Sequence, residues 1–129
     1  MSKRILVIDD DEAIRKSFAL ALEDTPYSVL TAESGEKGIR MIETEGCDLV
    51  FLDLKMPGMN GVETLREIRK RDLNVPVYII TAFYGEYFDL LKKAGQEGIH
   101  FEVMKKPIGL EEIDMVTRSM FEGPVSQPE

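Results

Sequence analysis

The sequence is poor in the residues that hold small folds together covalently or through metals. Its 129 residues include one cysteine, Cys47, and one histidine, His100. A single cysteine cannot form a disulfide within the chain, which is typical of proteins from a reducing cytosol. A lone histidine without cysteine or histidine partners is most simply a structural or surface residue. We therefore expect a cytoplasmic protein whose fold depends on its apolar core.

Long apolar runs and an excess of positive charge are also absent. No run approaches the ~20 residues of a membrane span, and the first one, at residues 5–8, is too short for a signal-peptide core. Sixteen lysines and arginines stand against 24 aspartates and glutamates, giving a net charge of −8 and a pI near 4.7. A domain with this net negative charge is repelled by phosphate backbones and anionic lipid surfaces. Direct nucleic-acid binding and membrane association are therefore not expected of this domain.

The sequence does contain a regular alternation of short apolar runs with longer amphipathic segments. We predict strands at residues 5–8, 27–31, 49–52, 77–80 and 99–104. Helical spacing of apolar residues and capping residues predict helices at residues 13–23, 34–45, 60–71, 86–94 and 110–120. Strict strand–helix alternation implies a parallel sheet covered on both faces. The chain length fits one domain, predicted at residues 1–121, followed by a polar tail or linker start at residues 122–129.

Chemically active side chains follow the ends of the predicted strands. They are Asp9, Asp10, Asp53, Thr81 and Lys106. In an open parallel sheet, ligands bind beyond the carboxyl ends of the strands. Carboxylates, a hydroxyl and an amine should therefore converge at one edge of the sheet.

Three carboxylates at one edge cannot easily all be ionised, because like charges at short range disfavour joint ionisation. A hard divalent cation with oxygen ligands resolves this conflict, and Mg²⁺ is the natural candidate. The edge lacks a G-x-G-x-x-G loop, which argues against dinucleotide or flavin binding. With the cation bound, the pocket would accept a phosphoryl group between Mg²⁺ and a lysine. Asp53 could then act as a nucleophile toward phosphorus and form an aspartyl phosphate.

Four segments together resemble the receiver domain of two-component response regulators, over residues 3–121. They are I-L-V-I-D-D-D-E at residues 5–12, F-L-D-L-K-M-P-G-M-N-G at 51–61, I-I-T-A at 79–82 and K-K-P-I at 105–108. The resemblance implies a flavodoxin-like (βα)5 fold of class α/β, with five parallel strands in the order 2-1-3-4-5. It also implies a phosphoacceptor function.

The resemblance assigns a role to each site residue. Asp53 would be the phosphoacceptor, and Mg²⁺ would be held by Asp9, Asp10, Asp53 and the backbone carbonyl of Lys55. Thr81 would donate a hydrogen bond to one phosphoryl oxygen, and Lys106 would form an ion pair with another. Gly61 matches the loop after the acceptor, where glycine relieves a backbone constraint.

The segment before Lys106 departs from the family pattern, because it is several residues longer than in typical receivers. Alignment on Lys106 places Val103 where the family commonly carries a switch aromatic, unless a bulge lets Phe101 substitute. A cluster of four aromatic residues within residues 83–88 is also unusual. Four such residues cannot all face inward from one helix, so we expect at least one to be exposed at a partner or homodimer surface.

We therefore interpret the chain as a regulatory phosphoacceptor rather than an enzyme acting on other substrates. The resemblance implies phosphorylation by a sensor histidine kinase or phosphotransfer protein, and action on an output domain or target protein. The fourth helix and fifth strand could also form a homodimer. One alternative is an aspartate-nucleophile phosphatase of the haloacid-dehalogenase type, whose D-x-D start Asp9-x-Asp11 imitates, although no cap insertion is present. The other is a receiver-like binding module that no longer cycles phosphate.

Overall fold

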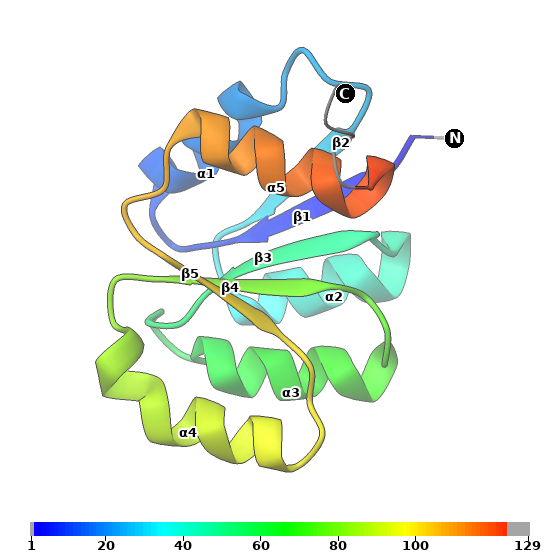
Figure 1. Cartoon of the computed structure of the whole chain (residues 1–129). Helices are drawn as coiled ribbons and strands as arrows, with labels where there is room; N and C mark the ends of the chain where they lie inside the picture. Colours follow the sequence, from blue (N-terminus) through cyan, green and yellow to red (C-terminus); the bar gives the residue numbers. More distant parts are fainter. Residues whose placement is uncertain (1, 124–129) are drawn as a thin grey trace, which may run out of the picture.

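Five parallel strands form the central sheet of the computed structural model, which describes residues 2–123 (Figure 1). Their spatial order is β2 (Ser28–Ala32), β1 (Arg4–Ile8), β3 (Leu49–Asp53), β4 (Val77–Thr81) and β5 (Glu102–Lys105). This confirms the predicted order 2-1-3-4-5. Strand order reverses between β1 and β3, so the carboxyl ends of these two strands border the crevice where such sheets bind ligands.

Helices cover both faces of the sheet. They are α1 (Glu12–Ala21), α2 (Gly35–Glu45), α3 (Gly61–Arg71), α4 (Tyr84–Gln96) and α5 (Leu110–Glu122). Figure 1 shows α1 and α5 on one face and α2, α3 and α4 on the other. The predicted doubly wound α/β class is confirmed. Within the described residues, no helix is both long and apolar enough to cross a bilayer.

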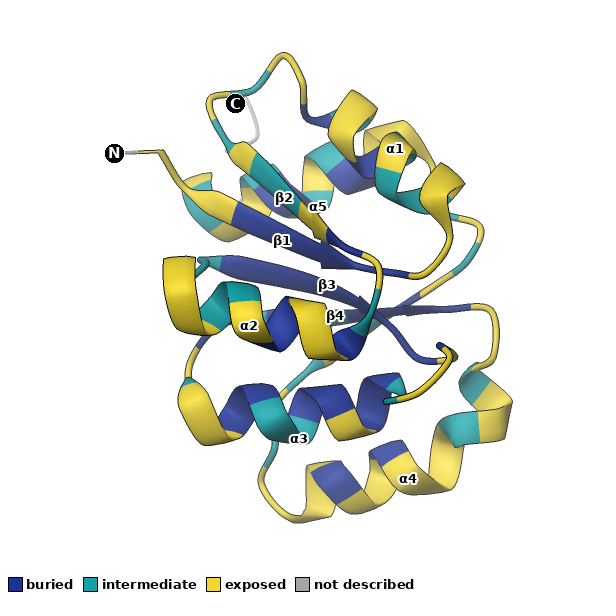
Figure 2. Ribbon diagram, turned by 180° about the vertical axis from the view of Figure 1, so that it is seen from behind, coloured by how far each residue is buried: buried dark blue, intermediate teal, exposed yellow. Residues whose placement is uncertain are grey.

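The core consists of two apolar clusters separated by the sheet. Residues 5–8 of β1 and all of β3 are buried, which Figure 2 shows as continuous dark strands. Leu6 and Ile8 pack toward the cluster beneath α2, α3 and α4, whereas Ile5 and Val7 pack toward α1 and α5. Because both faces of these strands are covered by apolar clusters, their sequences lack the alternation of apolar and polar residues that is typical of half-exposed strands.

Capping residues set several helix ends as predicted. The Ser34 side chain accepts a hydrogen bond from the Lys37 backbone at the start of α2. Asn60 and Glu63 form a complete capping box at the start of α3. Gly46 follows α2 with a φ of 71°, a left-handed value that glycine adopts without strain.

The region around β5 differs from the prediction. The helix expected at 86–94 runs from Tyr84 to Gln96 and passes through Gly95, so this glycine does not end it. The chain instead turns at Gly98, where φ is 86°. β5 is shorter than the strand expected at 99–104 and begins only at Glu102. The last helix includes Glu122, and residues 124–129 of the predicted tail lie outside the described residues.

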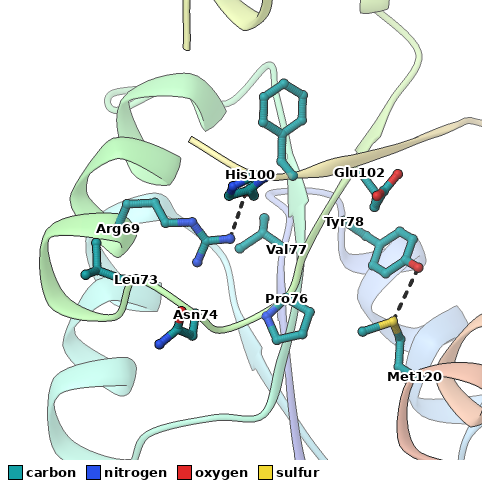
Figure 3. Close-up of a pocket in the computed structure, with 10 residues that line it drawn as sticks. Arg69, Leu73, Asn74, Pro76, Val77, Tyr78, His100, Glu102 and Met120 are labelled. Carbon is teal, nitrogen blue, oxygen red and sulfur yellow. Dashed lines mark hydrogen bonds between the residues drawn. The ribbon is translucent and has the colours of Figure 1, made fainter. Parts of the chain in front are cut away.

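The basic end of α3 includes one buried cation. Arg69 is only 8% exposed. Its guanidinium donates hydrogen bonds to the carbonyls of Asp72, Val75 and His100 at 3.2, 2.6 and 2.8 Å. Figure 3 shows Arg69 reaching toward His100. Both residues line a groove of about 310 Å³. Arg69 thus joins α3 to the segments that precede β4 and β5.

We expect Arg69→Met to lower the free energy of unfolding by about 1–3 kcal/mol, because three carbonyls lose their buried hydrogen-bond donor. Urea unfolding followed by circular dichroism measures this. Lys70→Met is the matched control, since Lys70 is exposed and pairs with Glu67 at the surface. It should change stability by less than about 0.5 kcal/mol. Equal effects of the two substitutions would contradict the anchoring role of Arg69.

Candidate functional site

Three carboxylates meet at the carboxyl edge of the sheet. Asp9 follows β1 directly and is fully buried, Asp53 is the last residue of β3 and is 4% exposed, and Asp10 is exposed. One carboxylate oxygen from each residue lies within 4.8 Å of the others. The structure therefore brings together the three aspartates that the strand-end pattern singled out.

Asp9 is held by hydrogen bonds from several elements. Its backbone N–H donates to the Ala32 carbonyl at 3.1 Å. Its Oδ1 accepts from the Asp11 N–H at 2.9 Å, and its Oδ2 accepts from Lys106 Nζ at 3.0 Å. Its own carbonyl accepts from Arg15 at 2.7 Å. Because both carboxylate oxygens and both backbone groups have partners, the orientation of this buried side chain is fixed.

Lys106 supplies the positive charge of the site. Its Nζ lies 3.0 Å from Asp9 Oδ2 and 3.5 Å from Asp53 Oδ1. Burial opposes the charge of this ammonium group, but the hydrogen bond to Asp9 and the negative charges of both aspartates together raise the pKa of Lys106. The side chain is therefore a cation placed between two carboxylates.

Burial, followed by the negative charge of Asp9, raises the pKa of Asp53 to about 7, although Lys106 acts in the opposite direction. Without a further cation, the Asp53 carboxylate thus holds its proton more tightly than an exposed aspartate. The three carboxylates and one ammonium leave an excess of negative charge. Oxygen ligands with such an excess suit a hard divalent cation.

Thr81 and Lys55 connect the site to the start of α4. Thr81 ends β4, and its buried Oγ1 accepts a hydrogen bond from the Phe83 N–H at 2.7 Å. The Lys55 side chain, in the loop after β3, lies 3.5 Å from a Glu86 carboxylate oxygen and 4.5 Å from the centre of the Phe83 ring. The first turn of α4 therefore depends on contacts with residues that flank the carboxylates.

The segment before Lys106 is in regular register. β5 pairs with β4 without a bulge, and Val103 stands opposite Ile79. Val103 is the third residue before Lys106 and lies within β5, whereas Phe101 lies before the first residue of the strand. Continuous parallel pairing leaves no extra residue that could shift Phe101 into this position. Both side chains are half-buried against the apolar cluster beneath α2, α3 and α4.

The aromatic cluster at the start of α4 divides between core and surface. Tyr84 and Tyr87 pack against the apolar cluster, whereas Phe83 and Phe88 are each 43% exposed. This confirms that four aromatic residues at this spacing cannot all face inward.

The raised pKa of Asp53 predicts a pH-dependent stability in the absence of divalent cations. The ordinary pKa of an aspartate is 3.8, against about 7 for folded Asp53. Between these values the folded state binds the proton more tightly than the unfolded chain does. Stability contributed by this group is therefore full below pH ~4 and is lost as the pH rises through ~7.

Asp53→Asn removes this loss. In the presence of a chelator, the variant should be more stable than the wild type by about 1–3 kcal/mol at pH 8 and by much less at pH 5, because each tenfold change in proton affinity corresponds to about 1.4 kcal/mol. Urea unfolding at the two pH values measures the difference. A stability difference that does not change with pH would show that Asp53 is an ordinary carboxylate.

Two aspartates, a threonine and a lysine thus stand at or directly after the carboxyl ends of the neighbouring strands β1, β3, β4 and β5 of an α/β domain. Residues 5–118 match the family model of the response regulator receiver domain. The chain belongs to this family, as its sequence motifs predicted.

Curated relatives and solved structures agree with this membership. The chain is 37% identical over 114 residues to the alkaline phosphatase synthesis transcriptional regulatory protein PhoP of Bacillus subtilis, covering 88% of this chain and 46% of PhoP. It is 40% identical over 104 residues to the transcriptional regulatory protein GlrR of Escherichia coli, covering 81% of this chain and 23% of GlrR. The chain therefore spans less than half the length of these two relatives.

The solved structures share the fold. A CheY-like response regulator receiver domain protein from Methanospirillum hungatei superposes with a TM-score of 0.82 at 27% identity, over 95% of this chain and 97% of that chain. NtrX from Brucella abortus superposes with a TM-score of 0.78 at 27% identity, over 95% of this chain and 27% of NtrX. The same fold thus occurs both as a separate domain structure and as part of a longer chain.

Proposed function

We propose that Asp53 accepts a phosphoryl group in a Mg²⁺-dependent reaction and that the aspartyl phosphate alters the surface formed by α4 and β5. One observation supports this above all. The Asp53 carboxylate lies within 4.8 Å of two other carboxylates and has the Lys106 ammonium 3.5 Å away. Buried carboxylates without a packing role are costly, and they are most often retained for chemistry.

The residues present fit a magnesium ion. Asp9, Asp10, Asp53 and the backbone carbonyl of Lys55 would hold it, and all four offer the oxygen ligands that Mg²⁺ prefers. When bound, the ion offsets negative charge on the carboxylates and on the incoming phosphoryl group.

Asp53 would carry out the transfer as a nucleophile. One of its carboxylate oxygens forms a bond to phosphorus, while the bond from phosphorus to a histidine nitrogen of the donor breaks and its electron pair remains on that nitrogen. Lys106 would pair with a phosphoryl oxygen. Attack of water on phosphorus would later release inorganic phosphate and restore the carboxylate.

Thr81 would carry the change to α4. Its hydroxyl now accepts from the Phe83 N–H, and donation to a phosphoryl oxygen would draw the side chain toward Asp53. A phosphoryl group adds a charge of about −2, which attracts Thr81 and Lys106 inward. The start of α4, which lacks a side-chain cap of its own, would then repack. Val103 would occupy the position from which the family's switch aromatic acts.

The partners follow from this reaction. A sensor histidine kinase or phosphotransfer protein would supply the phosphoryl group in the cytoplasm. An output domain or separate target would read the altered surface, which also suits a homodimer through α4 and β5. Residues 1–121 would be the receiver domain and residues 122–129 a tail or the start of a linker. The domain would thus regulate other proteins rather than act as an enzyme on outside substrates.

The test is labelling by acetyl phosphate with MgCl₂, followed by intact-mass spectrometry. We expect one phosphoryl group per chain and none when a chelator replaces MgCl₂. Multiple turnover of a phosphomonoester, lost in Asp9→Asn but kept in Asp53→Asn, would instead show a haloacid-dehalogenase-type phosphatase. Absence of labelling at saturating MgCl₂ would indicate a binding module that does not cycle phosphate.

A further inference from the structure

Arg15 contacts the backbone of the candidate site from outside the carboxylate cluster. It lies in the second turn of α1 and is half-buried. Its Nη1 donates a hydrogen bond to the Asp9 carbonyl oxygen at 2.7 Å. The Arg15 guanidinium thus binds a backbone carbonyl, whereas the neighbouring Lys16 pairs with the Glu12 carboxylate at the surface. A charged donor on a carbonyl is among the stronger hydrogen bonds of a protein.

The Arg15 side chain holds the β1 end of the short turn between β1 and α1, because it binds the Asp9 carbonyl. The α1 end is held by the helix backbone, where the N–H of residue 15 donates to the Asp11 carbonyl at 3.2 Å. Within the turn, the Asp11 N–H donates to Asp9 Oδ1 at 2.9 Å. Asp10 is exposed, so the position of its carboxylate depends on the backbone of this turn. Arg15 therefore constrains the backbone that presents two of the three carboxylates.

We propose that Arg15 is a positioning residue for divalent-cation binding, an inference that rests on the proposed function of the carboxylate cluster. Two effects of its removal have opposite signs. Loss of a nearby positive charge would make cation binding tighter by a few-fold at most, because solvent screens a half-exposed group. Loss of the hydrogen bond would free the turn, and removal of such outer partners typically weakens metal binding by about 10–100-fold. The positioning effect should therefore dominate.

The experiment is a calorimetric MgCl₂ titration of the full chain. Arg15→Met should weaken Mg²⁺ binding by about tenfold, and Arg15→Lys, which keeps a charged donor, should recover most of the affinity. Lys16→Met is the matched control, because it removes the same charge from the adjacent position of α1 and should leave the affinity within about twofold. Hydrogen exchange of the Asp11 amide, measured without metal, should be faster in Arg15→Met than in the wild type or in Lys16→Met.

The outcomes separate this inference from the proposed function. Equal or tighter Mg²⁺ binding by Arg15→Met, with unchanged Asp11 exchange, would overturn the positioning role while leaving the carboxylate site intact. Absence of saturable Mg²⁺ binding by the wild type would overturn the proposed function and the role of Arg15 with it. Urea unfolding of each variant identifies any loss of Mg²⁺ affinity that comes from global unfolding. If Arg15→Met does not fold, Arg15→Gln takes its place in the titration and in the exchange measurement, with the same weakening and the same faster Asp11 exchange expected.

Discussion

Replacing Asp53 by asparagine is expected to abolish phosphorylation by acetyl phosphate. The amide cannot act as a nucleophile toward phosphorus, so labelling should fall by roughly 10³-fold or more, as for other removed nucleophiles. Asp53→Glu retains the carboxylate but moves it outward by one methylene group. Displacement of a reacting atom by about 1 Å can cost ~100-fold, so this variant should also fail to label efficiently.

Asp89→Asn is the control for the Asp53 variants, because Asp89 is an exposed aspartate on α4 and is not one of the three clustered carboxylates. Its labelling should match that of the wild type in rate and extent. Intact-mass spectrometry over a time course measures all three variants under the same conditions. Labelling of Asp53→Asn at the wild-type rate would place the acceptor elsewhere.

Adding one methyl group at Gly61 is expected to damage the fold and the site together. Gly61 begins α3 directly beneath the end of β3. A Cβ atom there would lie 2.7 Å from the Leu54 Cα and still closer to the Asp53 carbonyl oxygen. Both neighbours are backbone atoms that cannot rotate away. Gly61→Ala should therefore lower the free energy of unfolding by about 2–4 kcal/mol.

Gly95→Ala is the matched control for Gly61→Ala. Gly95 lies within α4, and apart from its chain neighbours and the adjoining helix backbone, none of the described residues 2–123 has an atom within 4 Å of a Cβ added there. Alanine is a better helix former than glycine by about 0.5–1 kcal/mol, so this variant should be at least as stable as the wild type. Urea unfolding compares the two, and acetyl phosphate labelling tests whether Gly61→Ala also displaces Asp53. Wild-type stability of Gly61→Ala would show that α3 can move away from β3 at little cost.

Much of the fold could be predicted because its signals are local. The apolar runs of β1 and β3 are buried on both faces, and the caps at Ser34 and Asn60 use side chains next to the helices that they begin. The topology of parallel sheets then places Asp9 and Asp53 at one edge without any further information. The candidate site follows from the same rule, since its residues end strands or directly follow them.

The remaining features depend on contacts between distant segments. Gly95 lies inside α4, which continues to Gln96. A glycine in the sequence therefore did not reveal where this helix ends. Sequence does not show which distant carbonyls a long side chain will reach, so the contacts of Arg69 and Arg15 could not be predicted. The start of β5 depends similarly on pairing with β4 and on the anchor at His100.

Chemical mapping of the phosphoryl group tests the central claim most directly. Borohydride reduces an aspartyl phosphate to homoserine, which peptide mass spectrometry locates in the sequence. After reaction with acetyl phosphate and MgCl₂, we predict homoserine at residue 53 and aspartate at residues 9 and 10, with no conversion when a chelator is present. Conversion at Asp9 or Asp10, or no conversion at residue 53 in a fully folded sample, would contradict the assignment of Asp53 as the phosphoacceptor.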